Sequence, residues 1–382
     1  MSLQEQSNRF LKQIIRNYYA KRPLKEPPLL SMREVAVQPF GSKSYIRHLH
    51  FTSMSKLYDY IIENPPLHLY YSAATYDDPG NPDMESKGFR GADVLFDIDA
   101  DHYPECSHSV LICSKCGYVW INGGAECPRC GSRSLASLPQ LSIECLKKAW
   151  RDSRTIVRIL EEDFGASKIS TMFSGNRGFH IRVEDKHLLS LDRDSRRMLV
   201  DYIQLSSLDP GRVFPKVKLE KRGGYVALFH REHEYGLRAR IRDYLKSVET
   251  PIVMGDYEAY SYDNVINAIN ALKIGIDPAV TMDVSRLSRF SNSINGKSGL
   301  LSKSIDVSDE FNYSFYDFRA VSGEVLIKPA YDLTGVAVLD RKVNLRRGFI
   351  EKVEAYIGFY LALKGLAYLV RASRVEVLTS EH

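Results

Sequence analysis

Residues 93–101 read Asp-Val-Leu-Phe-Asp-Ile-Asp-Ala-Asp, an apolar strand that suddenly carries acidic residues. Side chains alternate between the two faces of a strand, so Val94, Phe96 and Ile98 share one face and Asp97 and Asp99 share the other. The two carboxylates then lie about 6–7 Å apart along the strand and can converge on a pair of divalent cations. Such a pair of ions is the usual device for phosphoryl or nucleotidyl transfer. A solvated acidic edge strand is the competing interpretation, and this short motif alone leaves both open.

Composition and charge limit the class of protein. The chain has 382 residues, 44% of them hydrophobic and 26% charged, with a formal net charge of +5. These values are typical of a folded soluble protein with a large core and two or three substructures. Residues 2–9 are polar, and the apolar stretch 355–370 is broken by Gly358 and Lys364 and is too short to span a bilayer. We therefore expect a cytoplasmic protein with no membrane partner.

Hydrophobic periodicity predicts an α/β (α+β) protein in which helical and strand-rich segments alternate. We expect a discontinuous core over 1–185 and 276–382, a turn-rich insertion at 104–138 and a mostly helical subdomain over 186–275. The expected helices span 6–21, 143–164, 193–206, 235–248, 261–274 and 345–371. The expected strands span 34–37, 44–51, 67–72, 91–99, 169–173 and 179–184, with strand character again over 302–327.

Four of the six cysteines form two Cys-x-x-Cys-Gly turns with ten residues between them: Cys113, Cys116, Cys127 and Cys130. This spacing predicts one structural, tetrahedral Zn²⁺ site closed by four thiolates. A redox pair or a disulfide is the alternative, and a cytoplasmic location argues against a stable disulfide. Cys106 or His108 could replace one ligand. Cys145 is interpreted as a packed free thiol.

The sequence Ser-Gly-Asn-Arg-Gly-Phe-His at residues 174–180 forms a second candidate site. Its glycines allow backbone amides to approach an anion, and Arg177 can bind phosphate oxygens in a bidentate manner. In the strand that follows, His180 and Arg182 share the polar face. An ordinary hairpin turn is the competing interpretation.

A third segment supplies a carboxylate and several cations. Asp277 is a candidate third metal ligand, and residues 286–297 contain Arg286, Arg289 and Lys297, of which Lys297 is a candidate phosphate contact. Two basic runs could also form a phosphate-binding track or simply be solvated faces. The first comprises Arg212, Lys216, Lys218, Lys221, Arg222, Arg231, Arg238, Arg240 and Arg242, and the second Arg341, Lys342, Arg346 and Arg347.

In this order, the segments resemble the catalytic (small) subunit of the archaeo-eukaryotic DNA primases, archaeal type, from about residue 33 to 300. The resemblance rests on the Val-Leu-Phe-Asp-Ile-Asp strand, the zinc knuckle after it, Ser-Gly-x-Arg-Gly-x-His, and the Asp then Arg…Gly-Lys segment. The combination is specific, although no single element is. The resemblance implies the family fold, an α/β (α+β) unit with a small mixed catalytic sheet flanked by helices, a zinc-bearing insertion and a helical subdomain.

The resemblance implies roles for individual residues. Asp97, Asp99 and Asp277 would hold two Mg²⁺ or Mn²⁺ ions, with Asp283 as the alternative third ligand. Asn176 and Asn295 stand where relatives carry Arg and His. The residues implied in nucleotide binding are Ser174, Arg177, His180, Arg289, Lys297, Glu34, Tyr45 and Arg47.

The resemblance also implies an activity and partners. The enzyme would join NTPs into short RNA primers on single-stranded DNA by two-metal nucleotidyl transfer, together with a primase large subunit. Two alternatives stay open: a zinc-ribbon nucleic-acid-binding subunit without catalysis, and an Asp-x-Asp glycosyltransferase.

Overall fold

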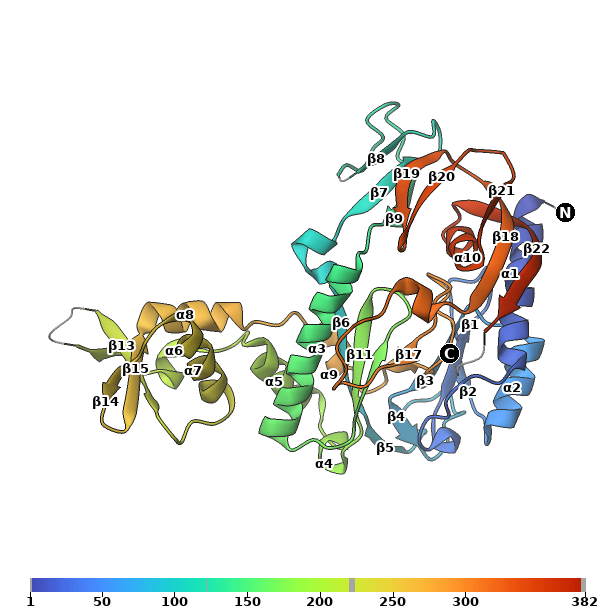
Figure 1. The fold of residues 1–382 in the computed structure, drawn as a ribbon. Helices are drawn as coiled ribbons and strands as arrows, with labels where there is room; N and C mark the ends of the chain where they lie inside the picture. Colours follow the sequence, from blue (N-terminus) through green and yellow to red (C-terminus); the bar gives the residue numbers. More distant parts are fainter. Residues whose placement is uncertain (1, 122, 220–223, 379–382) are drawn as a thin grey trace.

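The computed structural model describes residues 2–121, 123–219 and 224–378. Figure 1 shows a large body, a smaller lobe that projects to one side of it, and a hairpin-rich insertion that rises from the body. Within the described ranges, no helix is both long and apolar enough to cross a membrane. Among the described residues, four short 3₁₀ turns connect the larger elements: η1 (Leu30–Met32), η2 (Ala100–His102), η3 (Pro104–Cys106) and η4 (Phe315–Phe318).

The acidic strand belongs to a four-stranded sheet of order β17-β10-β11-β6. Every pairing in it is antiparallel, whereas the sequence predicted a mixed sheet, because a tight hairpin joins β10 to β11 and β6 runs against β11. One face packs against the long helix α3, which begins after the N-cap Ser142 and ends at Gly165, as predicted. The elements are β6 (Val94–Asp99), β10 (Ile169–Phe173), β11 (Gly178–Val183), β17 (Lys303–Ser304) and α3 (Ile143–Phe164).

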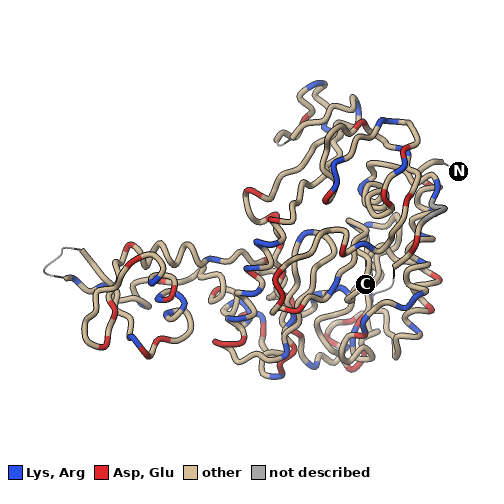
Figure 2. The backbone as a smooth tube through the Cα atoms, in the orientation of Figure 1, with Lys and Arg blue, Asp and Glu red and all other residues tan. Residues whose placement is uncertain are grey.

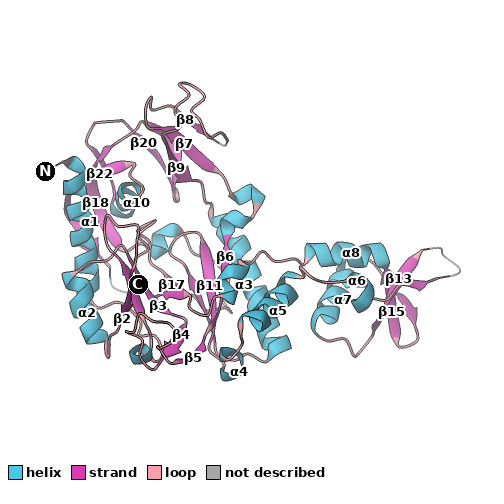
Figure 3. Ribbon diagram, turned by 180° about the vertical axis from the view of Figure 1, so that it is seen from behind, coloured by secondary structure: helices cyan, strands magenta, loops and turns pink. Residues whose placement is uncertain are grey.

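A second sheet, of order β16-β3-β1-β2, lies beside the first (Figure 3). Asp93 joins the two sheets, since its buried carboxylate pairs with Arg33 near β1 and with Arg182 of β11. Thr281 of α9 donates a hydrogen bond to the Leu95 carbonyl (2.7 Å). The elements are β1 (Val35–Gln38), β2 (Ile46–Leu49), β3 (His68–Ser72), β16 (Leu287–Arg289), the hairpin β4 (Ala74–Tyr76) and β5 (Phe89–Ala92), α2 (Met54–Glu63) and α9 (Pro278–Met282).

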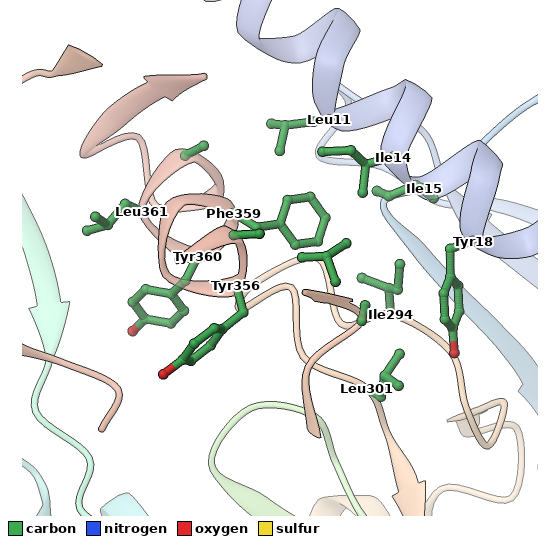
Figure 4. Packing of buried hydrophobic residues seen from close by; sticks show 14 of the residues in the cluster. Leu11, Ile14, Ile15, Tyr18, Ile294, Leu301, Tyr356, Phe359, Tyr360 and Leu361 are labelled. Atoms are coloured by element: carbon green, nitrogen blue, oxygen red, sulfur yellow. The ribbon is translucent and has the colours of Figure 1, made fainter. Parts of the chain in front are cut away.

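The two ends of the chain pack together. Phe359 of α10 lies among Leu11, Ile14 and Ile15 of α1 in one core (Figure 4), so α10 is a buried core helix. The prediction of one helix over 345–371 is wrong: strands β21 and β22 flank α10, which has only nine residues and is buried on all its faces. The elements are α1 (Leu3–Ala20), α10 (Ala355–Leu363), β18 (Val321–Pro329), β19 (Leu333–Val338), β20 (Arg341–Leu345), β21 (Glu351–Glu354) and β22 (Ala367–Val377).

The projecting lobe adds a sheet to the subdomain that the sequence predicts as mostly helical over 186–275. Residues 205–272 have their own core and an antiparallel sheet of order β12-β13-β15-β14, whereas helix α5 packs on the body. Two of its strands, β12 and β14, have only two and three residues, too few to show an alternating pattern. The body elements are α4 (Lys186–Leu189) and α5 (Arg193–Gln204); the lobe contains α6 (Pro210–Val213), α7 (Gly236–Val248), α8 (Tyr262–Ala271), β12 (Val217–Lys218), β13 (Tyr225–His230), β14 (Ile252–Met254) and β15 (Tyr257–Ser261).

The insertion between β6 and α3 forms a small sheet of order β8-β7-β9. Few apolar side chains are buried within it: Val110, Ile112 and Leu138. We therefore expect cross-links rather than apolar packing to hold this segment together. Its strands are β7 (Ser109–Cys113), β8 (Val119–Ile121) and β9 (Leu135–Pro139).

Candidate active site and metal centre

The acidic strand β6 has the two faces that the sequence predicts. Val94, Phe96 and Ile98 are fully buried against α3, and Asp97 and Asp99 face the other way. Burial raises the pKa of Asp97 to about 6, with a further upward push from Asp277 that opposes the cation Arg286. Burial also raises the pKa of Asp99, and the neighbouring Asp97 charge adds to the effect. The strand thus holds two carboxylates whose charge is not fully balanced by the protein.

The third carboxylate stands at the start of helix α9. The Asp277 side chain accepts a hydrogen bond from the Ala279 amide (2.9 Å), and its charge acts on Asp97. Asp283, at the other end of the short helix, is exposed and accepts hydrogen bonds from Ser285. The position of Asp277 therefore favours it over Asp283 as the third ligand.

The segment 174–178 forms the tight turn between β10 and β11. Ser174 is buried, and its Oγ accepts hydrogen bonds from the amides of Asn176 (3.3 Å) and Gly178 (3.2 Å). A Cβ at Gly178 would overlap the carbonyl oxygen of Ile98, so this position requires glycine. Arg177 is half-buried, and its guanidinium contacts Asp99 (3.2 Å) and Asp101 (2.6 Å). The turn therefore places a cation directly beside the acidic strand.

Three further predicted residues, His180, Arg289 and Lys297, line the same space as this turn. His180 pairs with Asp97 across the sheet, with its Nε2 3.6 Å from Asp97 Oδ1. Burial, together with the Arg289 cation, lowers the pKa of His180 to about 4, so the ring is neutral at pH 7. Arg289 donates to the Tyr70 hydroxyl (2.7 Å), and its other terminal nitrogen, Nη1, is buried with no hydrogen-bond partner among the described residues. The Lys297 side chain is exposed on a turn held by the hydrogen bond from the Gly296 amide to His68 (3.2 Å).

Most of these groups line one cleft between the two sheets, although Asp277 does not. Asp97 and Asp99 come from β6, Arg177 from the β10–β11 turn, and Arg286, Arg289 and Lys297 from the segment 286–297. The polar lining residues are Tyr70, Asp97, Asp99, Ser174, Asn176, Arg177, His180, Arg286, Ser288, Arg289, Asn295 and Lys297. Carboxylates that can bind cations and cations that can bind phosphate thus meet in a single space.

The predicted patch of Glu34, Tyr45 and Arg47 is only partly at this cleft. Glu34 is completely buried and paired with Lys87 (2.5 Å) and Arg47 (2.7 Å), and it does not line the cleft. The pKa of Glu34 is lowered, because the hydrogen bonds from these two cations outweigh its burial. Tyr45 packs edge-on against Tyr70, which lines the cleft. Glu34 therefore holds Lys87 and Arg47 in position behind the wall of the cleft and does not face a ligand.

Two residues near the carboxylates were not assigned a role from the sequence. Arg286 lines the cleft and is the strongest cationic influence on Asp97. Asp101 binds Arg177 and approaches Asp99 and His102 closely enough for the three to share a metal ion. Asp101 follows Asp99 at the same two-residue spacing by which Asp99 follows Asp97. The strand ends at Asp99 and the turn η2 begins, so strand alternation alone does not predict the position of Asp101.

The four cysteines of the two turns come together in the insertion. Their Sγ atoms all lie within 4.8 Å of one another, with 3.6 Å between Cys113 and Cys130 and between Cys116 and Cys127. Four sulfurs about 2.3 Å from one Zn²⁺ would be separated by about 3.8 Å. The set fits a closed zinc site, and His108 is not part of it.

The other two cysteines contradict the predictions made for them. Cys106 and Cys145 form a disulfide, so Cys145 is not a free thiol and Cys106 is not available to a metal. The bond joins the start of the insertion to the start of α3, which the sequence could not show because the two residues are 39 positions apart.

The basic runs are largely structural. Arg238 binds Glu234 and backbone carbonyls, and Arg240 binds Asp163 at the junction of lobe and body. Figure 2 shows Lys and Arg interspersed with Asp and Glu along the lobe, and no continuous basic track is visible on the described backbone. Lys221 and Arg222 lie outside the described residues, and Arg341 and Arg346 pair with acidic residues.

Comparisons with known proteins agree with one another. A family model described as DNA primase small subunit matches residues 142–307. A protein named DNA primase small subunit PriS from Staphylothermus marinus is 40% identical over 381 residues, which cover 99% of both chains. Proteins of the same name from Saccharolobus islandicus and Hyperthermus butylicus are 36% and 34% identical and cover 95% and 96% of this chain, and 96% and 97% of their own lengths. The polymerase domain from Mycobacterium tuberculosis Ligase D in complex with DNA superposes with a TM-score of 0.38 and 10% identity, covering 80% of this chain and 86% of its own, which is too distant to support a conclusion.

Proposed function

Because the chain belongs to the DNA primase small subunit family, we propose that it is a nucleotidyltransferase, the catalytic subunit of a primase. It makes short RNA primers from NTPs on a single-stranded DNA template. The observation that carries this proposal is the cleft itself, in which Asp97 and Asp99 face Arg177, Arg289 and Lys297. Carboxylates for metal ions and cations for a triphosphate are the two requirements of nucleotidyl transfer.

The carboxylates fit divalent cations by their chemistry. Asp97 Oδ1 is buried and has no hydrogen-bond partner in the described part of the chain, as expected of an oxygen that binds a cation. Asp97, Asp99 and Asp277 would hold Mg²⁺ or Mn²⁺, hard ions that prefer oxygen ligands. When bound, two such ions would activate the attacking hydroxyl and neutralise charge on the leaving group.

The protein side chains position the reacting groups. The 3′-oxygen of the first nucleotide or primer forms a bond to the α-phosphorus, and the bond from the α-phosphorus to the β-phosphate oxygen breaks. Pyrophosphate leaves with the electron pair, and the hydroxyl proton passes to solvent. Arg177, Arg289 and Lys297 bind the phosphate oxygens as charge moves onto them, and neutral His180 can donate a hydrogen bond.

The partners follow from this activity. Single-stranded DNA is the template, NTPs are the substrates, and a primase large subunit completes the complex in the cytoplasm at the replication fork. The insertion, which leaves β6 directly after Asp99, orders the template or the initiating nucleotide, and its zinc is structural.

One gel separates this proposal from a non-catalytic zinc-ribbon protein and from a glycosyltransferase. The purified protein is incubated with radiolabelled NTPs, single-stranded DNA and Mn²⁺. We expect short oligonucleotide ladders that require the template. DNA binding without synthesis, or transfer of a sugar from a nucleotide-sugar in place of synthesis, would reject primase activity.

A further inference from the structure

A second cleft opens on the other side of the phosphate-binding turn. Asn176, Arg177 and Lys297 line both clefts and thus form the wall between them. The far wall is formed by Tyr360 and Lys364 from the end of α10. None of the residues that the proposed function assigns to metal binding lines this second space.

The charges in the second cleft are not balanced. Asp101 is its one acidic residue among the described lining, and its carboxylate is already paired with Arg177 (2.6 Å). The side-chain amines of Lys297 and Lys364 have no ion pair or hydrogen bond within the described residues. Burial and the neighbouring Lys297 and Arg177 charges lower the pKa of Lys364 to about 8. Cations held together without counter-charges favour a polyanion.

The position of this cleft identifies which polyanion it receives. In an in-line transfer the attacking oxygen and the leaving oxygen lie on opposite sides of the α-phosphorus. Arg177 and Lys297, two of the cations that would bind the triphosphate, line both clefts, whereas Arg289 lines only the first. The leaving pyrophosphate carries the β- and γ-phosphates that these two cations would bind, so it can be reached from the second cleft.

We propose that the second cleft binds pyrophosphate, with Lys364 as a binding residue that receives it together with Lys297 and Arg177. This inference rests on the proposed function and adds a product site to it. Cleavage of the α–β phosphate bond generates the pyrophosphate. Arg177 and Lys297, which line both clefts, bind its phosphate groups before and after the cleavage. Lys364 reaches the site from the C-terminal part of the chain, so product release depends on α10.

Pyrophosphate itself is the probe. Its dissociation constant is measured by calorimetry on the full chain with Mg²⁺, and its inhibition constant is measured in primer synthesis. We expect Lys364→Met to weaken both by about tenfold or more, since it removes charge-assisted hydrogen bonds. Lys364→Arg should retain affinity within about threefold. The control is Lys352→Met, an exposed lysine paired with Glu324, which should behave as wild type.

A second variant guards against misfolding of Lys364→Met. His108 is exposed and lines the same cleft, so His108→Glu adds a negative charge without disturbing a core and should weaken pyrophosphate binding severalfold. Primer synthesis with pyrophosphate affinity unchanged within twofold in both variants would overturn the product site alone. Absence of primer synthesis by wild type, with pyrophosphate binding still dependent on Lys364, would overturn the proposed function and leave a polyphosphate site.

Discussion

The cysteine-rich insertion and the acidic cleft are built in opposite ways. The four cysteines of the insertion lie between residues 113 and 130, in a segment with few buried apolar side chains. The groups of the cleft come from β6, from the β10–β11 turn and from residues 286–297, and two packed sheets bring them together. A local site depends on its cross-links, whereas a site assembled from distant segments depends on the core. We therefore expect the two to fail independently.

Removal of zinc should have the largest effect on stability, and it should be confined to the insertion. Structural zinc contributes on the order of 10 kcal/mol to the folding of small domains. Cys116→Ser should reduce zinc from one ion per chain to none and expose residues 107–140 to proteolysis, while the fluorescence-detected melting of the body changes little. Metal analysis and limited proteolysis measure both results.

Ser114→Ala, in the same turn, is the matched control and should keep its zinc. A full zinc complement in Cys116→Ser would mean that another residue such as His108 is a ligand. Global unfolding of the zinc-free protein would contradict the independence of the two regions.

Asp97→Asn should have the converse effect. It removes a metal ligand without creating a cavity, so we expect primer synthesis to fall by about 10³-fold or more, equivalent to roughly 4 kcal/mol in the barrier. Circular dichroism and zinc content should not change. The control is Asp59→Asn, whose side chain is 71% exposed on α2. Primer synthesis by Asp97→Asn at a rate near that of wild type would refute the metal assignment.

How much the sequence could predict follows the same division. The four-cysteine cluster and the two faces of β6 were predictable because spacing and alternation are local properties. The Cys106–Cys145 bond and the burial of Glu34 beneath Lys87 were not, because each depends on segments brought together by the fold. The sheet of the lobe was hidden for another reason: β12 and β14 have only two and three residues, too few to show an alternating pattern.

The disulfide should stabilise the insertion by a smaller amount than zinc. It closes a segment of 39 residues, part of which zinc already constrains, and chain entropy then gives about 3–4 kcal/mol. Cys106→Ala combined with Cys145→Ala should lower stability by that amount in urea titrations with zinc present. Cys145→Ala with a wild-type urea midpoint would show that the bond does not form in solution.

The smallest expected effect concerns pH and the cleft wall. Burial, with the nearby Arg289 and Lys297 charges, lowers the pKa of His68 to about 2. In the unfolded chain His68 takes up a proton near pH 6.5, whereas in the folded chain it stays neutral. The free energy of unfolding therefore falls as the pH drops below 6.5. Between pH 7.5 and 5 we expect His68 to account for a loss of about 2 kcal/mol.

His68→Gln keeps an acceptor for the Gly296 amide but does not titrate. Its free energy of unfolding should therefore fall about 2 kcal/mol less than that of wild type over the same pH range. Identical pH profiles of the two proteins would show that His68 is not held neutral in the fold.

Anomalous diffraction from crystals grown with Mn²⁺ and a non-hydrolysable NTP tests most directly whether catalysis and zinc occupy separate sites. At the manganese edge we expect peaks beside Asp97 and Asp99, with the triphosphate on Arg177 and Lys297. At the zinc edge we expect one peak among the four cysteines. Manganese and nucleotide bound elsewhere, with no density at the two carboxylates, would contradict the assignment of the cleft as the active site.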